Sequence, residues 1–148
     1  DGYADAVVAG QAWHWVDPVR AVPEVARVLR PGGSLGLIWN DRDERDPWIH
    51  ALSSLLRQYG TSPDAGYEPV VGAPFGPLET AELAWAHDVP VAAVIDMVTS
   101  RSYVIAMPPD RRAELVGQVR TLADENANRE TGLVPVPYIT HGYRAVRP

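Results

Sequence analysis

Residues 5–39 read DAVVAGQAWHWVDPVRAVPEVARVLRPGGSLGLIW, and this stretch decides the fold class. Asp5–Gly10 is a short apolar run closed by glycine, which predicts a strand buried on both faces. Asp17 and Pro18 predict a helix start, with the aspartate as N-cap and the proline at the first helical position. Ser34–Trp39 is a second apolar run that predicts another buried strand. A strand, a helix and a strand in this order indicate a parallel sheet with a crossover helix, and hence an α/β fold.

The composition narrows the classes of function. The chain has 148 residues, 46% of them hydrophobic, which is enough for one domain with a real core. A formal net charge of -6 argues against a nucleic-acid partner, which needs a basic face. No stretch approaches the roughly 18 to 20 apolar residues of a membrane helix. The chain has no cysteine, which excludes a disulfide scaffold and a thiolate metal site and fits a cytoplasmic location.

The rest of the chain continues the alternation of helices and strands. Asp46 and Pro47 repeat the helix-start pattern, Val91–Val98 suits a short helix, and Pro109 opens another. A strand is predicted over residues 82–89, where apolar and polar side chains alternate.

Two more segments complete the predicted order. Residues 61–77 have little periodicity and predict a loop. The C-terminal tail is predicted to become a regular strand only near Tyr138, because Pro135 and Pro137 have no N–H group to donate to a sheet.

Polar and aromatic side chains follow both apolar runs directly. Gln11–Trp15 comes after the first predicted strand, and Trp39–Asp41 occupies the equivalent place at the end of the second. In open α/β sheets, ligands bind outside the carboxyl ends of the strands, so these groups could form the rim of a binding site. The alternative is that the tryptophans pack against neighbouring helices and His14 caps a chain end. The residue pattern alone leaves both interpretations open.

Three other patterns are weaker indications of a functional site. Pro31–Gly33 leaves a predicted helix and enters a strand, the reverse of a phosphate-binding loop, so it predicts a tight turn. Residues 41–46 hold four carboxylates interleaved with two arginines, which favours a solvated loop over a metal site. No paired histidine spacing and no nucleophilic-serine motif occurs, so neither a metal centre nor a serine hydrolase is predicted.

The run from Ala4 to Leu52 closely resembles the class I S-adenosylmethionine-dependent methyltransferases, in particular the trans-aconitate-methyltransferase-like branch known as methyltransferase type 11. The phrase Leu29-Arg-Pro-Gly-Gly before an apolar strand is similar to that superfamily's commonest signature, and Gln11-Ala-Trp-His-Trp15 to the branch's own. Ser100–Tyr103 and the tail from Pro137 resemble the branch's C-terminal half, so the similarity covers most of the chain.

The resemblance implies an architecture: the C-terminal half of a Rossmann-like sheet, holding strands four to seven and flanking helices. Residues 5–10 would be the fourth strand, 34–39 the fifth and 82–89 the sixth. The seventh, residues 138–146, would be antiparallel and inserted between the fifth and sixth. Residues 1–148 would then form a single partial domain, and the glycine-rich cofactor-binding portion would be absent from it.

The resemblance also implies roles for particular residues. Gln11, Ala12 and His14 would flank the methionine end of the cofactor, S-adenosylmethionine. A rim of six residues would face a small-molecule methyl acceptor: Trp13, Trp39, Asn40, Trp48, Arg101 and Tyr103. An acceptor carboxylate would need no base, whereas an acceptor hydroxyl would make His14 the candidate catalytic base.

Three functions remain open from the sequence. The first is methyl transfer by a longer parent chain. The second is a noncatalytic fragment that binds no S-adenosylmethionine; the strand at residues 5–10 would then be an exposed apolar edge, and two copies of the chain are expected to associate through it. The third, an unrelated α/β small-molecule binder, would require both motif matches to be accidental.

Overall fold

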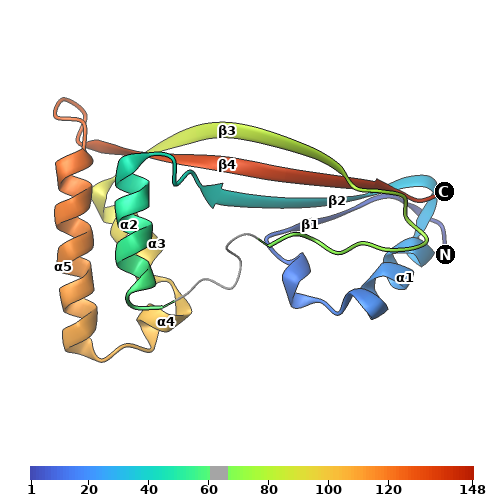
Figure 1. Ribbon diagram of the computed structural model, residues 1–148, viewed down its shortest axis with the longest axis horizontal. Helices are drawn as coiled ribbons and strands as arrows, with labels where there is room; N and C mark the ends of the chain where they lie inside the picture. Colours follow the sequence, from blue (N-terminus) through green and yellow to red (C-terminus); the bar gives the residue numbers. More distant parts are fainter. Residues whose placement is uncertain (61–66) are drawn as a thin grey trace. The chain divides into compact units, whose positions relative to one another are not determined.

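The structure is a computed structural model that describes residues 1–60 and 67–148 (Figure 1). The predicted strand, helix and strand at the start of the chain are confirmed. Of the loop predicted over residues 61–77, the first six residues lie outside the described residues. The elements in chain order are β1 (Ala4–Gly10), the short 3-10 helix η1 (Trp13–Trp15), α1 (Pro18–Val28), β2 (Leu29–Arg42), α2 (Pro47–Arg57), β3 (Glu79–Pro90), α3 (Val91–Thr99), α4 (Ser102–Ile105), α5 (Pro109–Asn126) and β4 (Leu133–Val146).

The four strands form one mixed sheet in the order β1-β2-β4-β3. β1 and β2 are parallel, with Val7 beside Leu35 and Ala9 beside Leu37. β4 runs against β2 (Figure 1): the N–H of Asp43 donates to the carbonyl of Pro137, and Gly33 accepts from Arg147 near the other end. The predicted place of the last strand, antiparallel and between the two strands that precede it in the chain, is therefore confirmed.

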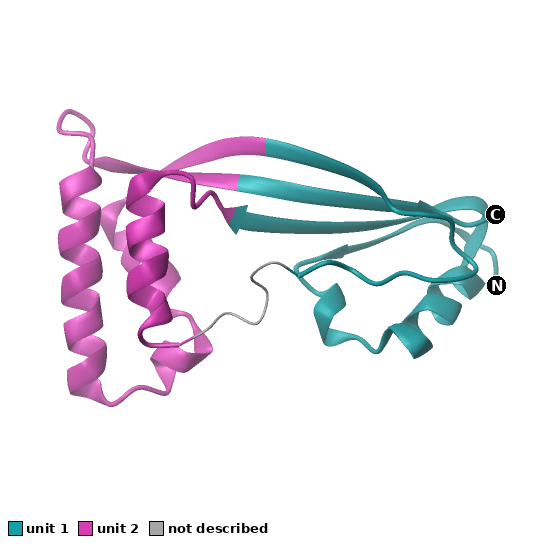
Figure 2. Ribbon diagram, in the orientation of Figure 1, with its two compact units in different colours: residues 1–41, 63–83, 139–148 teal, residues 42–62, 84–138 magenta. Residues whose placement is uncertain are grey.

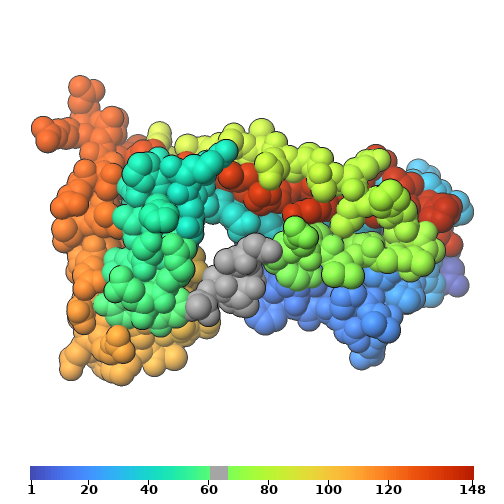
Figure 3. Space-filling model, in the orientation of Figure 1, coloured from blue at the N-terminus to red at the C-terminus, as the bar shows by residue number. Residues whose placement is uncertain are grey.

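β3 runs antiparallel to β4, as three side-chain pairs show. Arg144 meets Glu79 at 3.1 Å, His141 meets Glu82 at 3.0 Å, and the ring of Tyr138 stacks on Trp85 at 4.9 Å between centroids. Each step forward in β3 matches a step backward in β4. The side chains of β3 are almost all exposed, and Figure 3 shows the strand at the surface.

The chain divides into two compact units (Figure 2). Unit 1 consists of Asp1–Asp41, Pro63–Leu83 and Ile139–Pro148, and unit 2 of Arg42–Ser62 and Ala84–Tyr138. β2, β3 and β4 contribute residues to both units, whereas β1 and α1 belong to unit 1 and the helices α2–α5 to unit 2.

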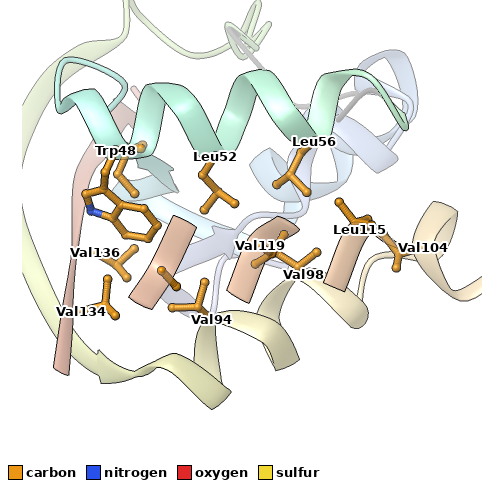
Figure 4. Packing of buried hydrophobic residues seen from close by; sticks show 12 residues of the cluster. Trp48, Leu52, Leu56, Val94, Val98, Val104, Leu115, Val119, Val134 and Val136 are labelled. Carbon is orange, nitrogen blue, oxygen red and sulfur yellow. The ribbon is translucent and has the colours of Figure 1, made fainter. Parts of the chain in front are cut away.

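Unit 2 has an aliphatic core built by α2, α3, α5 and the start of β4. From α2, the side chains of Trp48, Leu52 and Leu56 point toward α3 and α5 (Figure 4). Leu52 and Leu115 are fully buried. Asp46 caps α2 as predicted, because its carboxylate accepts from the N–H of Trp48 at 3.0 Å.

Unit 1 buries one face of its sheet. Leu35, Leu37 and Trp39 alternate inward along β2 and pack with residues of α1 and of the segment 67–78. The residues between them point the other way, and Ile38 is 40% exposed, as is Val8 at 65%. The prediction that both apolar runs are buried on both faces is therefore wrong for the described residues; each run has one covered face.

Two further predictions are corrected by the structure. β4 begins at Leu133 and includes both prolines, because the carbonyl groups of Pro135 and Pro137 still accept hydrogen bonds although their nitrogens cannot donate. The turn at Pro31–Gly33 lies inside β2 as a bulge, where the register with β1 shifts and Gly32 adopts φ +78. The expected glycine dihedral is confirmed, but the strand starts before the turn.

None of the helices in the described ranges 1–60 and 67–148 has the length and hydropathy that a membrane crossing needs.

Candidate functional site

Gln11 sits at the point where β1 ends, in a conformation that few side chains adopt. Its φ is 51, in the left-handed region, which costs a non-glycine residue free energy and is frequent at functional sites. The backbone N–H of Gln11 donates to the carbonyl of Ile38 at 2.9 Å, which extends the pairing of β1 with β2 by one residue. The chain therefore leaves the sheet at a fixed angle.

The side chain of Gln11 continues this pairing beyond the backbone. Its amide oxygen accepts from the N–H of Asn40 at 3.0 Å, and its amide nitrogen donates to the Asn40 carbonyl at 3.4 Å. The hydroxyl of Thr140 donates to the Asn40 side-chain oxygen at 2.7 Å. Residues from β1, β2 and β4 are thus tied together at one place in unit 1. The sequence predicted that the segments holding Gln11 and Asn40 follow two adjacent parallel strands, and the structure brings these two residues together.

An aromatic cluster lies in the same unit. The ring of Trp39 is 5.3 Å from Tyr67 and 5.8 Å from Tyr143, measured between centroids. His14 contacts Tyr67 at 5.7 Å and Trp15 at 4.8 Å. His14 and Trp39 therefore share a neighbour, Tyr67, as expected if the ends of the two parallel strands serve one site.

The buried tryptophans of unit 1 differ in their indole N–H groups. Trp13 is 4% exposed and donates to the carbonyl of Val70 at 3.2 Å. Trp39 is 2% exposed, and within residues 1–60 and 67–148 its indole nitrogen has no acceptor. Buried donors almost always have a partner, so Trp39 keeps hydrogen-bonding capacity for a water molecule or a ligand. Ala12 is exposed, and its carbonyl accepts from the N–H of Trp15 at 3.0 Å.

A cavity of about 670 Å³ lies beside the cluster, with Tyr143 in its wall. His141 and Glu82 also line it, 3.0 Å apart, and Asp41 is 3.6 Å from the other imidazole nitrogen. Burial raises the pKa of Tyr143, and the nearby charges of Glu68, Asp41 and Glu82 raise it further. The phenol therefore stays protonated at neutral pH and can donate a hydrogen bond. None of the predicted site residues lines this cavity.

Three predicted rim residues belong to unit 2. Trp48 is 6% exposed in its aliphatic core, and its indole donates to the carbonyl of Pro135 at 2.8 Å. Tyr103 is partly buried against Gly60, where a Cβ atom would come within 2.8 Å of its ring. Arg101 precedes α4, and its Nε atom is buried without a hydrogen-bond partner in the described part of the chain. Whether these residues contact an acceptor stays a prediction.

Sequence reasoning missed Tyr67, Tyr143 and Arg42. Tyr67 lies in a segment without periodicity, so nothing in the local pattern marks it. Tyr143 was predicted only as a residue of the last strand, with no role in a site. Arg42 was interpreted as a charge in a solvated loop, yet it ends β2 and is partly buried. No three histidine, aspartate or glutamate side chains among the described residues lie close enough to hold a metal ion.

Comparisons with known proteins show what this chain is similar to. A family model described as "Methyltransferase domain" matches residues 1–37. An uncharacterized methyltransferase from Mycobacterium tuberculosis is 43% identical over 151 residues, which cover 98% of this chain and 59% of the relative. An uncharacterized methyltransferase-like protein from Schizosaccharomyces pombe is 28% identical over 83% of this chain and 50% of its own length.

A solved structure supports the fold. A protein from Anaeromyxobacter dehalogenans, described provisionally as a type II methyltransferase, superposes with a TM-score of 0.64 at 24% identity. The match covers 99% of this chain and 65% of that one. The chain thus spans 59% of the length of the mycobacterial relative, and it is similar to part of a methyltransferase domain.

Proposed function

We propose that the full-length protein transfers a methyl group from S-adenosylmethionine to a small-molecule acceptor. The observation that carries the proposal is the junction of Gln11 and Asn40, which joins the ends of two parallel strands in the unit that also holds the aromatic cluster of Trp39. Carboxyl ends of parallel strands are where α/β enzymes bind their ligands. Gln11, Ala12 and His14 would hold the methionine end of the cofactor.

The aromatic side chains of unit 1 suit this cofactor. S-adenosylmethionine supplies a methyl carbon activated by a positively charged sulfur. Aromatic faces stabilise such a cation, and His14, Tyr67 and Trp39 form a continuous series of ring contacts. The positive φ of Gln11 costs free energy of folding, and residues with such strained backbone are frequent at binding sites.

The protein's part in the reaction is mainly to position the two reactants and exclude water. S-adenosylmethionine, with its methionine end at Gln11, Ala12 and His14, would supply the methyl carbon that the acceptor's oxygen attacks, and the electron pair of the broken carbon–sulfur bond would stay on sulfur. An acceptor carboxylate is already ionised and gives up no proton. An acceptor hydroxyl must lose its proton, and His14 would accept it.

The test uses the His14→Ala variant of the full-length protein with labelled methyl donor. With a hydroxyl acceptor, loss of the base is expected to lower turnover by about 10²–10⁴-fold. With a carboxylate acceptor, turnover should fall far less. Val19→Ala, at a residue of α1 that is 82% exposed, is the matched control. Unchanged turnover of His14→Ala with every acceptor that is methylated would remove His14 from the reaction.

An alternative function is favoured by the exposure of β1. β1 is the terminal strand of the sheet, and Tyr3 and Val8 beside and within it are 76% and 65% exposed. We propose that a chain without catalytic activity would associate with a second copy along this edge. Sedimentation equilibrium should then show a dimer that Val8→Lys dissociates. A monomer at all concentrations would exclude this alternative.

A further inference from the structure

Two arginine side chains of unit 2 have buried atoms that no hydrogen bond uses. Arg42 is the last residue of β2, and Arg101 directly precedes α4. The Nε atom of each is inaccessible to solvent and has no partner in the part of the chain that the structure describes. Both residues as a whole are only partly buried.

The surroundings of Arg42 supply little compensation for its charge. Its one side-chain hydrogen bond reaches the hydroxyl of Ser53 at 3.5 Å, which is long for such a bond. The carboxylates close to it in sequence contact other basic side chains: Asp41 is 3.6 Å from His141, Asp43 is held by Arg45 at 2.7 Å, and Glu44 is held by Arg57 at 2.9 and 3.1 Å. Neither Arg42 nor Arg101 forms an ion pair with any carboxylate in the described residues.

The positive charge of Arg101 also acts on Arg42. Burial lowers the pKa of Arg42, and the positive charge of Arg101 lowers it further, while Tyr138, Tyr103 and Glu44 oppose the change. Two partly buried guanidinium groups that act on one another's charge and form no ion pair with a carboxylate of the described residues are a costly arrangement for a folded chain. Native proteins retain such groups chiefly where binding requires them.

We propose that Arg42 and Arg101 together bind an anionic group, a carboxylate or a phosphate, of a small molecule. Guanidinium groups bind both anions through paired N–H donors, and the buried Nε atom is one of those donors. The ring of Tyr103, held against Gly60, would form a wall of this site. Identifying the ligand with the methyl acceptor rests on the proposed function; the anion site itself does not.

The experiment is calorimetric titration of the full-length protein at constant ionic strength, without S-adenosylmethionine. Inorganic phosphate and succinate serve as separate probes and distinguish the two anions. At least one should bind saturably, and Arg101→Gln should weaken that binding by about tenfold or more. Arg101→Lys keeps the charge but loses the paired N–H donors of the guanidinium group. Its affinity for the anion should lie between those of the parent and Arg101→Gln. The control is Arg120→Gln, an exposed arginine of α5 with the same change in net charge, which should bind like the parent.

A measurement of stability separates a binding role from a structural one. Without ligand, the melting temperature of Arg101→Gln should equal or exceed that of the parent, because an unpaired buried charge is removed. A lower melting temperature together with unchanged binding would make Arg101 a structural residue and overturn the proposal. So would the absence of saturable binding by both probes, or equal binding by Arg101→Gln and Arg120→Gln.

Separate titration with S-adenosylmethionine distinguishes this proposal from the proposed function. If the methyl donor binds and neither anion does, the anion site is wrong and the methyltransferase activity stands. If an anion binds through Arg101 and the methyl donor does not bind at all, the anion site stands and the proposed function fails.

Discussion

Unit 1 and unit 2 each bury tryptophan side chains, but the hydrogen bonding of the indole N–H group differs between them. In unit 2, Trp48 donates to the carbonyl of Pro135 at 2.8 Å and is one member of an otherwise aliphatic core. In unit 1, Trp39 is as deeply buried, but its N–H has no acceptor in the described residues and it contacts the rings of Tyr67 and Tyr143. The first arrangement is that of a completed core. The second leaves a buried donor available, as ligand sites do.

The same difference extends to the backbone. Among the described residues, the positive φ in unit 2 falls on a glycine, Gly132, whereas unit 1 holds the non-glycine residue Gln11 at a positive φ and ties it to Asn40 through its side chain. Unit 2 is therefore expected to supply most of the stability, and unit 1 the binding of the methyl donor. The following predictions test this contrast.

The largest effect is expected from the core of unit 2. Leu52→Ala removes a fully buried side chain, so the free energy of unfolding should fall by about 2–5 kcal/mol. Chemical denaturation measures the change. Ile105→Ala, at a position of the same unit that is 61% exposed, should change stability far less. Similar losses in both variants would show that the core of unit 2 does not dominate stability.

The two tryptophans allow a direct comparison. Both Trp48→Phe and Trp39→Phe lose the same ring volume, but only Trp48→Phe breaks a hydrogen bond and leaves a carbonyl unpaired. The Trp48 variant should therefore lose about 1–3 kcal/mol more stability than the Trp39 variant. Equal losses in denaturation experiments would indicate that the N–H of Trp39 is also satisfied in solution.

The helix caps should behave alike in the two units. The carboxylates of Asp17 and Asp46 each accept from a backbone N–H at 3.0 Å at the start of α1 and α2. Asp17→Ala and Asp46→Ala should each cost about 0.5–2 kcal/mol in thermal unfolding. A much smaller cost for Asp17→Ala than for Asp46→Ala would show that α1 contributes little to cooperative unfolding.

The smallest effect is expected from an ion pair of unit 2 between the exposed Arg45 and the partly buried Asp43. The hydrogen bonds from Arg45 lower the pKa of Asp43. Because the folded-state pKa is depressed, this contribution to stability is present above the carboxyl's pKa in the unfolded chain and is lost as pH falls through the lower folded value. Arg45→Gln should reduce stability only above that acidic range, and NMR titration of Asp43 should show its pKa rising toward the ordinary value. An unchanged Asp43 titration would contradict the pairing.

Local chemistry explains what the sequence predicted well. An Asp-Pro pair defines a helix start without help from distant residues, and both such starts were predicted at the correct residue. The order of the strands followed from the family resemblance, and the placement of the segments after β1 and β2 at one end of the sheet followed from the parallel pairing of these strands.

Contacts between segments that lie far apart in the sequence explain what the sequence did not predict. Whether both faces of an apolar strand are covered depends on other segments, so the exposure of Val8 and Ile38 could not be inferred from their own runs. β4 was predicted too short because the accepting role of its prolines depends on Trp48 and Asp43. Arg42 looked like a surface charge because burial of its Nε atom arises only from tertiary packing.

The central claim is that unit 1 binds the methyl donor and unit 2 supports the fold. Calorimetric titration of S-adenosylmethionine into the full-length protein tests it most directly, with Gln11→Ala and Trp48→Phe as the paired variants. The donor should bind the parent; Gln11→Ala should bind at least about tenfold more weakly, since it loses the amide that joins β1 to Asn40. Trp48→Phe should bind like the parent although it is less stable. No binding by the parent, or equal binding by Gln11→Ala, would contradict the account.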